Sequence, residues 1–281
     1  MFQPGTLLQN RYQVLDTLGR GGFSQTFAVK DGSTLKVLKV LVDDYEKAIA
    51  LFRREAFVLS HLNHPGIPRV DLDGYFTHTV EQSSPPAHCL IMELIPGINL
   101  SQWMTQTRHR PILEPQAIAW LKQLAEILQQ IHRHRYFHRD IKPSNIMLKP
   151  NGQLVLIDFG AVRKATPTLF FKYNAHQQGT HLYSRGYTPA EQMQGRAIPR
   201  SDFFALGRTL VYLITGKHPL EFSCDCATGT LDWRASAPQI SSAFADLIDQ
   251  LMAPLPGQRP SSPTAILHRL EQFEDSAIQF A

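Results

Sequence analysis

The stretch His138-Arg139-Asp140-Ile141-Lys142-Pro143-Ser144-Asn145 decides the fold of this chain. It is followed by Asp158-Phe159-Gly160, directly after the apolar run Leu154-Val155-Leu156-Ile157, which predicts a short buried strand. With each residue type at roughly one position in twenty, H-R-D-x-K-x-x-N would arise by chance about once in several million positions. The two segments are therefore interpreted as parts of one functional motif rather than as turns between a helix and a strand.

Together these segments resemble the catalytic loop and metal-binding motif of the eukaryotic-type, or Hanks-type, serine/threonine protein kinases. The resemblance runs from about Tyr12 to about Leu270. It implies an α+β, two-lobed protein kinase fold, with a small N-terminal antiparallel sheet lobe that carries one helix and a larger, mainly helical C-terminal lobe. Several local sequence variants, such as Asn63-His64-Pro65-Gly66, resemble those of bacterial members of the family, cyanobacterial ones in particular.

The resemblance also assigns chemistry to the two segments. Phosphoryl transfer needs a carboxylate at the attacking hydroxyl and metal ions that neutralise the phosphates. By the resemblance, Asp140 is the catalytic base and Lys142 steadies the γ-phosphate of ATP, while Asn145 and Asp158 hold Mg2+. Carboxylate and amide oxygens are hard ligands that suit this ion. The lysine in H-R-D-x-K is typical of serine/threonine rather than tyrosine kinases, so the expected acceptors are Ser and Thr hydroxyls of proteins, including this chain itself.

A glycine-rich turn is predicted to hold the phosphates. Its residues Gly19, Gly21, Gly22 and Ser24 lie between two strand-like runs, where bare backbone N–H groups can approach phosphates closely. The turn departs from the family pattern G-x-G-x-x-G, because Ser24 holds the third glycine position and Thr26 replaces the usual valine over the nucleotide base. We expect these departures to alter ATP affinity rather than abolish it.

Two lysines fit the position that anchors the phosphates. Ala28-Val29-Lys30 mimics the family's V-A-I-K motif, but Lys30 comes only eleven residues after Gly19 and precedes the turn Asp31-Gly32. Lys39 is therefore preferred, and strand alternation places it on one face with Val37, which is expected near the adenine. Its expected partner is Glu55, a carboxylate on the apolar side of a predicted helix that would otherwise be costly to bury.

The adenine slot and the segment that presents the substrate follow from the same resemblance. Met92 is expected as gatekeeper, Glu93 and Ile95 as hinge residues, and Met147 and Ile157 as the residues that close the slot. The residues expected around the activation segment share polar or phosphate-linked roles: Arg139 as a phosphate partner, Thr166, Thr168 and Thr180 as candidate acceptors, Ser184 beside Asp140 and Lys142, Asp202 as a buried acceptor for the catalytic loop, and Arg259 as the partner of Glu191. Ala190 stands where the family more often has proline.

Periodicity divides the chain into a sheet-rich first part and a helical second part. The predicted strands contain Tyr12–Leu15, Gln25–Val29, Leu35–Val40 and Cys89–Met92, and the predicted helix of this part is capped by Asp43 or Asp44. The second part has a helix with Pro115 at its first position, a central buried helix over Phe203–Ile214, and amphipathic stretches at Phe244–Met252 and Thr264–Phe273. The expected domains are a nucleotide-binding lobe at 1–95, a catalytic and substrate-binding lobe at 96–275 and a tail at 276–281.

Composition is that of an ordinary globular protein, with 43% hydrophobic and 19% charged residues among 281. The net charge of +4 is too small and dispersed for a nucleic-acid footprint, and no apolar run reaches the ~18–20 residues of a membrane helix. Cys89, Cys224 and Cys226 cannot all pair within the chain, which favours reduced thiols in a cytoplasmic protein. No nucleic-acid partner and no membrane segment are expected.

Two other functions compete with an active protein kinase. A pseudokinase that binds ATP as a scaffold without transfer would explain Ser24, Thr26 and Ala190, but Lys39, Glu55, Asp140, Asn145 and Asp158 are all present. A small-molecule phosphotransferase on a kinase-like fold is disfavoured by Arg139 and by the extended segment before Glu191, which suits a peptide substrate. The sequence therefore predicts a transferase with a complete catalytic set.

Overall fold

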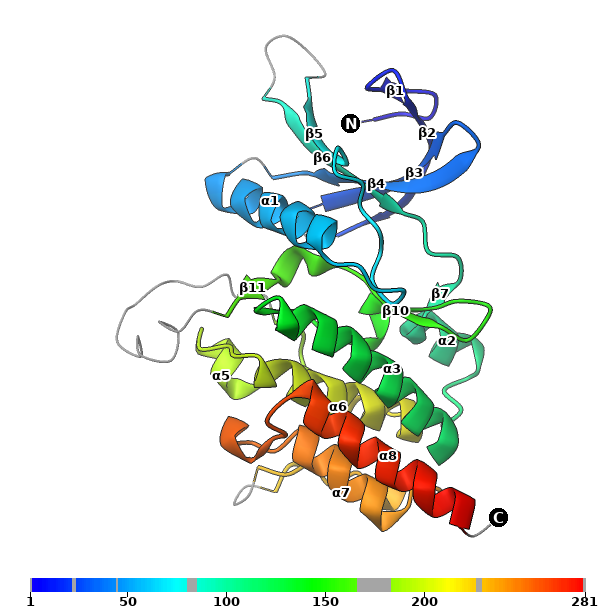
Figure 1. Cartoon of the computed structure of the whole chain (residues 1–281), viewed down its shortest axis with the longest axis vertical. Coiled ribbons are helices and arrows are strands. Elements are labelled where there is room, and N and C mark those ends of the chain that lie inside the picture. Colours follow the sequence, from blue (N-terminus) through cyan, green and yellow to red (C-terminus); the bar gives the residue numbers. More distant parts are fainter. Residues whose placement is uncertain are drawn as a thin grey trace. The chain divides into compact units, whose positions relative to one another are not determined.

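The computed structural model describes residues 2–21, 24–43, 45–79, 85–165, 183–225 and 229–279. They form two compact units, Met1–Pro96 and Gly97–Ala281, called unit 1 and unit 2 below (Figure 1). Among the described residues, no helix is both long and apolar enough to span a bilayer.

Unit 1 is an antiparallel six-stranded sheet with one helix. The strand order is β1-β2-β3-β4-β6-β5, so β2, β3 and β4 form a meander (Figure 1). Side chains alternate between two faces, and one face buries an apolar core that includes Val14, Phe27, Val29, Leu38 and Ile91. The opposite face carries Val37 and Lys39. The elements are β1 (Leu7–Leu8), β2 (Tyr12–Arg20), β3 (Ser24–Asp31), β4 (Thr34–Leu41), α1 (Glu46–His61), β5 (Tyr75–His78) and β6 (Ala87–Glu93).

Helix α1 starts differently from the sequence prediction. Its N-cap is Tyr45, whose side chain makes no capping hydrogen bond, so the predicted cap at Asp43 is wrong; Asp44 lies outside the described residues. The chain enters the helix through an extended residue, and Glu46 in the first turn places negative charge at the positive end of the helix dipole. This start leaves Phe52, Glu55, Ala56 and Leu59 on the buried side of the helix.

Unit 2 is mainly helical and is built around α6, which has buried residues on all sides. Helix α3 packs against α6 and α8, and α7 packs against α6. Pro115 is the second rather than the first residue of α3. The helices are α2 (Leu100–Gln106), α3 (Glu114–Arg133), α5 (Ala190–Met193), α6 (Arg200–Thr215), α7 (Ser242–Leu251) and α8 (Pro263–Gln279), with 3-10 turns at Pro143–Asn145, Phe159–Ala161, Pro219–Glu221, Arg234–Ser236 and Pro256–Gln258.

Two small sheets in unit 2 flank the segment that carries the sequence motif. One has the order β10-β9-β7 and the other pairs β11 with β8. The motif His138 to Asn145 runs from the end of β8 into a 3-10 turn and then into β9, so short strands hold both of its ends. The strands are β7 (Ile98–Asn99), β8 (Tyr136–Phe137), β9 (Ile146–Leu148), β10 (Leu154–Leu156) and β11 (Arg163–Lys164).

Candidate active site

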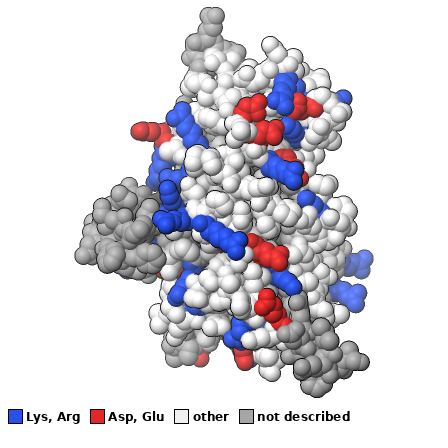
Figure 2. All heavy atoms as spheres, in the orientation of Figure 1, with Lys and Arg blue, Asp and Glu red and all other residues white. Residues whose placement is uncertain are grey.

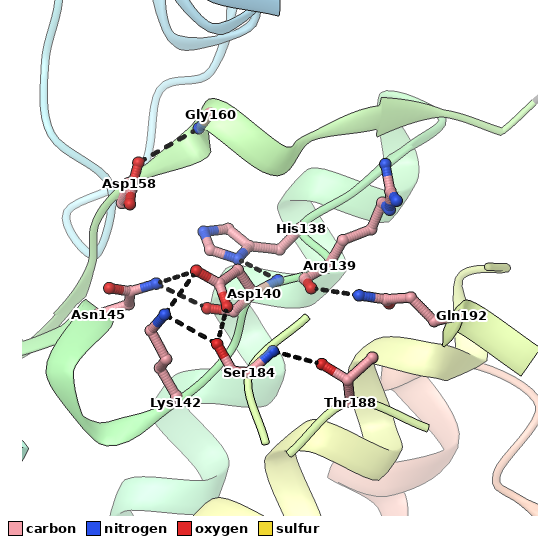
Figure 3. Close-up of polar contacts among 10 residues, drawn as sticks. All are labelled: His138, Arg139, Asp140, Lys142, Asn145, Asp158, Gly160, Ser184, Thr188 and Gln192. Carbon is pink, nitrogen blue, oxygen red and sulfur yellow. Dashed lines mark hydrogen bonds and ion pairs between the residues drawn. The ribbon is translucent and has the colours of Figure 1, made fainter. Parts of the chain in front are cut away.

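Asp140 is held by three side chains of unit 2 (Figure 3). Lys142 Nζ donates to Asp140 Oδ2 at 2.9 Å, and Asn145 Nδ2 donates to the same oxygen at 2.9 Å. Ser184 Oγ donates to Asp140 Oδ1 at 2.7 Å and accepts from Lys142 Nζ at 2.9 Å. A carboxylate offers about four acceptor positions, so these three donors fix its orientation and leave one position for a further donor.

A buried carboxylate of α6 fixes the backbone of this loop. Asp202 is completely buried and accepts hydrogen bonds from the N–H of His138 at 2.9 Å and of Arg139 at 2.8 Å. His132 Nε2 lies 3.0 Å from the same carboxylate. The predicted role of Asp202 as acceptor for the loop backbone is therefore confirmed. Hydrogen bonds from several N–H groups offset the free-energy cost of burying a carboxylate.

Arg139 adopts a backbone conformation that costs energy. Its φ is +73°, in the left-handed region that a residue with a Cβ rarely enters. Its N–H bonds to Asp202, while its carbonyl oxygen accepts from Gln192 Nε2 at 2.7 Å. The peptide groups on both sides are thus tied to buried partners, which hold the strained turn that brings Asp140 out of the loop (Figure 3).

His138 lies next to Asp140 and has a neutral ring. Its Nδ1 accepts from the Asp140 N–H at 3.3 Å, and its ring meets the buried Phe159 edge-on, with 4.9 Å between the ring centroids. Full burial lowers the pKa of His138, and nearby carboxylates only partly offset this. The ring therefore supports the loop as a packed, uncharged group.

Asn145 and Asp158 offer the oxygens expected of a magnesium site. Both hydrogen bonds of Asn145 Nδ2 run to Asp140, so the amide oxygen points away from that carboxylate (Figure 3). The Ile157 N–H donates to the carbonyl oxygen of Asn145 at 2.8 Å, which joins the two segments. Asp158 is in the left-handed region, with φ +63°, and its side chain accepts from the Gly160 N–H at 3.4 Å. Among the described residues no cluster of three His, Cys, Asp or Glu side chains could hold a metal ion. Mg2+ is usually bound by one or two carboxylates together with substrate phosphates.

Unit 1 holds the predicted lysine–glutamate pair. Lys39 Nζ lies 2.7 Å from Glu55 Oε1 and 2.9 Å from Oε2, and the Glu55 side chain is only 2% exposed. Lys39 extends from β4 and Glu55 from α1, so the pair joins the helix to the sheet. Lys30, the alternative lysine, is exposed on β3. The two side chains expected to pair do so, and their role toward ATP stays a prediction.

The remaining residues predicted for nucleotide binding are distributed over both units. In unit 1 the turn between β2 and β3 is closed by a hydrogen bond from the Gly21 N–H to the Ser24 carbonyl at 2.7 Å; Gly22 lies outside the described residues. Met92 pairs with Val37 and Glu93 with Lys36 across β6 and β4, and Ile95 is buried. In unit 2, Met147 and Ile157 are half-buried.

Glu191 and Arg259 form the predicted ion pair. Arg259 Nη1 lies 2.6 Å from Glu191 Oε1, and its second nitrogen 3.2 Å from Oε2. The other guanidinium hydrogens bond to the carbonyl oxygens of Ala253, Arg200 and Pro254, so all five donors are used on a completely buried side chain. The candidate acceptors Thr166, Thr168 and Thr180 lie outside the described residues.

Three supporting residues were missed in the sequence. Gln192 is 5% exposed, Thr188 is 6% exposed and accepts from the Ser184 N–H at 2.8 Å, and His132 contacts Asp202. Gln192 and Thr188 lie on either side of Ala190 and Glu191, but both contact backbone groups, which several residue types could contact, so the sequence carried little signal for them. His132 carried none, because a histidine near a helix end is usually solvated.

The comparisons with known proteins agree with this geometry. The family model described as "Protein kinase domain" matches residues 12–270. Serine/threonine-protein kinase C of Synechocystis is 36% identical over 96% of this chain and 51% of its own length, and PknA of Nostoc is 33% identical over 94% of this chain and 48% of its own length. The chain thus spans about half the length of these curated relatives. The crystal structure of the Mycobacterium tuberculosis PknI kinase domain matches with a TM-score of 0.71 over 97% of this chain and 99% of that chain, at 20% identity, which shows the shared fold.

The resemblance stated from the sequence motifs to bacterial serine/threonine kinases is confirmed by these relatives, and the predicted α+β kinase fold by the structural match. The family model covers most of both units. The chain belongs to the protein kinase domain family.

Proposed function

We propose that this chain transfers the γ-phosphoryl group of ATP to Ser or Thr hydroxyls of proteins. The observation that carries the proposal is the carboxylate of Asp140, oriented by Lys142, Asn145 and Ser184 and retaining one acceptor position. A base that must receive a hydroxyl proton needs this combination of fixed orientation and an accessible oxygen. The Asp140 side chain is 18% exposed, so a substrate hydroxyl can reach it.

In the proposed reaction the acceptor hydroxyl hydrogen-bonds to Asp140 and gives up its proton there as its oxygen bonds to the γ-phosphorus of ATP. The bond between that phosphorus and the bridging oxygen of the β-phosphate breaks, and ADP leaves. Lys142, which already bridges Asp140 and Ser184, supplies positive charge beside the reacting oxygens. Asn145 and Asp158 would hold Mg2+, which neutralises phosphate charge when bound. Lys39, fixed by Glu55, would pair with the phosphates from unit 1. Autophosphorylation and a cytoplasmic location belong to the same proposal.

The test is transfer of labelled γ-phosphate from Mg-ATP to the chain itself and to a generic basic protein. Wild type should label both, and Asp140→Asn should lose at least about 100-fold, as expected when a general base is removed. Asp232→Asn is the matched control, because it makes the same substitution at an exposed position of unit 2. Tight ATP binding without transfer by wild type would contradict the proposal and support a scaffold. Equal rates for wild type and Asp140→Asn would contradict the role of Asp140.

A further inference from the structure

One row of residues crosses three strands of unit 1. Gly19 pairs with Thr26 across β2 and β3, and Thr26 pairs with Lys39 across β3 and β4. Directly opposed residues of antiparallel strands present their side chains on the same face. Thr26 therefore shares a face with Lys39, whereas its neighbour Phe27 points into the core on the other face. The row thus connects the glycine-rich turn with the lysine that anchors the phosphates in the proposed reaction.

The β2–β3 ladder is irregular where it enters this row. The register shifts between Thr17 and Gly19, a bulge that interrupts regular backbone pairing. At this point Thr26 Oγ1 donates to the carbonyl oxygen of Gly19 over 3.2 Å, in a partly buried position. A side chain therefore makes a cross-strand hydrogen bond where the ladder has just been disturbed. Valine, the usual residue here in the family pattern, has no hydroxyl and cannot make it.

We propose that the Thr26 hydroxyl positions the phosphate-binding turn of this chain. It ties the carbonyl of Gly19 to β3 and so holds Gly19 to Gly21 in register with Lys39. Thr26 is a positioning residue, because its hydroxyl hydrogen is directed to Gly19 and it acts through the backbone. The inference rests on the proposed function, because that function makes the phosphates of ATP the ligand of this turn. Threonine, at a position where the family usually has valine, then supplies a cross-strand hydrogen bond at the point where the bulge interrupts the backbone ladder.

The experiment compares Thr26→Val, which keeps the shape and removes the hydroxyl, with Thr26→Ser, which keeps the hydroxyl and removes the methyl group. Two properties are measured: amide hydrogen exchange over Leu18 to Gly21 without ligand, and the dissociation constant for the ATP analogue AMP-PNP with MgCl2. Loss of one hydrogen bond predicts about 2- to 10-fold faster exchange and a similar weakening of AMP-PNP binding in Thr26→Val, with Thr26→Ser near wild type. Thr77→Val, at an exposed position of β5, is the control and should change neither property.

The outcomes separate this inference from the proposed function. Unchanged exchange in Thr26→Val, or weaker AMP-PNP binding in Thr26→Ser than in Thr26→Val, would overturn the positioning role and indicate that the methyl group matters instead. If the two variants behave as expected but wild type transfers no phosphate, the proposed function fails and the positioning of the turn stands. If wild type does not bind AMP-PNP, both are overturned.

Discussion

Asp202 shows how much of the site depends on one residue that would touch no substrate. Its carboxylate takes two backbone N–H groups of the catalytic loop at 2.8 and 2.9 Å in a fully buried position. Asp202→Asn replaces one accepting oxygen by a donor, which then faces another donor. We expect a loss of about 2–4 kcal/mol in the free energy of unfolding, since a buried N–H is left without an acceptor.

Urea unfolding of Asp202→Asn measures this loss, and phosphate transfer at permissive temperature measures its effect on the loop. The loss of transfer activity should exceed the fraction of protein that is unfolded, because Arg139 also loses support for its left-handed backbone conformation. A stability within about 0.5 kcal/mol of wild type would show that the loop backbone does not depend on this carboxylate.

At the residue level the sequence was most informative where chemistry restricts residue type. Asp140, Lys142, Asn145 and Asp158 were assigned from the resemblance of their two motifs to those of the protein kinases, and Lys39 was preferred to Lys30 because of its distance along the chain from Gly19. The supporting residues were harder to find. Gln192 contacts a backbone carbonyl, a function that several residue types could perform, so its position in the sequence carries little information.

At the scale of elements, α1 is linked to the sheet by a short chain of hydrogen bonds. Arg53 Nε donates to Tyr75 Oη at 3.0 Å, and Tyr75 Oη lies 2.6 Å from His88 Nδ1. Since arginine can only donate, the tyrosine hydrogen is available to donate to Nδ1 of a neutral His88. Burial lowers the pKa of His88, in agreement with that assignment. This link and the Lys39–Glu55 pair together set where α1 lies on the sheet.

Removing the link should loosen α1. Arg53→Met is expected to cost about 0.5–1.5 kcal/mol of unfolding free energy and to speed amide exchange in α1, because one hydrogen bond is lost. Arg54→Met is the matched control, an equally exposed neighbour on the same helix for which the described part of the chain shows no such bond. Equal effects of the two substitutions would mean that helix propensity, not the link to Tyr75, is being measured.

The end of α6 depends on glycine for a steric reason. Gly216 has φ +72°, and a Cβ there would overlap the carbonyl oxygen of His109. Gly216→Ala should therefore cost more than about 2 kcal/mol in urea unfolding, combining backbone strain with a clash. Gly195→Ala separates the two effects, because Gly195 has φ +77° but open space around it, and should cost only about 1 kcal/mol. A similar loss at both sites would contradict the close approach to His109.

Predictions for elements succeeded where periodicity was strong and failed where elements were short. The strands β2, β3, β4 and β6 and the helices α3, α6, α7 and α8 follow from apolar spacing. Strands β1 and β5 and helix α2 were not predicted, because two to seven residues give too little periodicity to separate from a loop. The misplaced cap of α1 has a similar cause, since two adjacent aspartates precede the helix in the sequence, and the structure places the N-cap at Tyr45 rather than at Asp43.

For the whole molecule, histidines with lowered pKa values contribute to the response to acid. Burial lowers the pKa of His88 and His138, and partial burial lowers the pKa of His218, from the usual value near 6.5. The unfolded chain therefore binds more protons than the folded chain once the pH falls below about 6.5, so stability falls in that direction. Arg11 holds the pKa of Asp31 at about 2, so this carboxylate stays ionised throughout. On the face drawn in Figure 2, basic and acidic side chains lie next to one another at several places.

The free energy of unfolding should decrease between about pH 7.5 and pH 5.5, and urea titrations at both values measure it. His88→Gln should reduce the dependence, because one of the three groups no longer titrates. A stability that is constant or rises toward pH 5.5 would contradict the neutral state of these rings.

The guanidinium of Arg259, whose five donors are all used in hydrogen bonds, also limits how far the chain can be shortened. It bonds to the peptide backbone at Arg200, Ala253 and Pro254 and to the carboxylate of Glu191, so one side chain near the C-terminal helix fastens segments that lie far apart in sequence. A fragment cut before this residue would keep every catalytic motif and still lack the cation that gathers those segments. Lysine, a single point of charge, could not serve four partners in one plane. A stretch able to fold as unit 2 must therefore extend at least to this structural arginine, well beyond the last residue assigned to the chemistry.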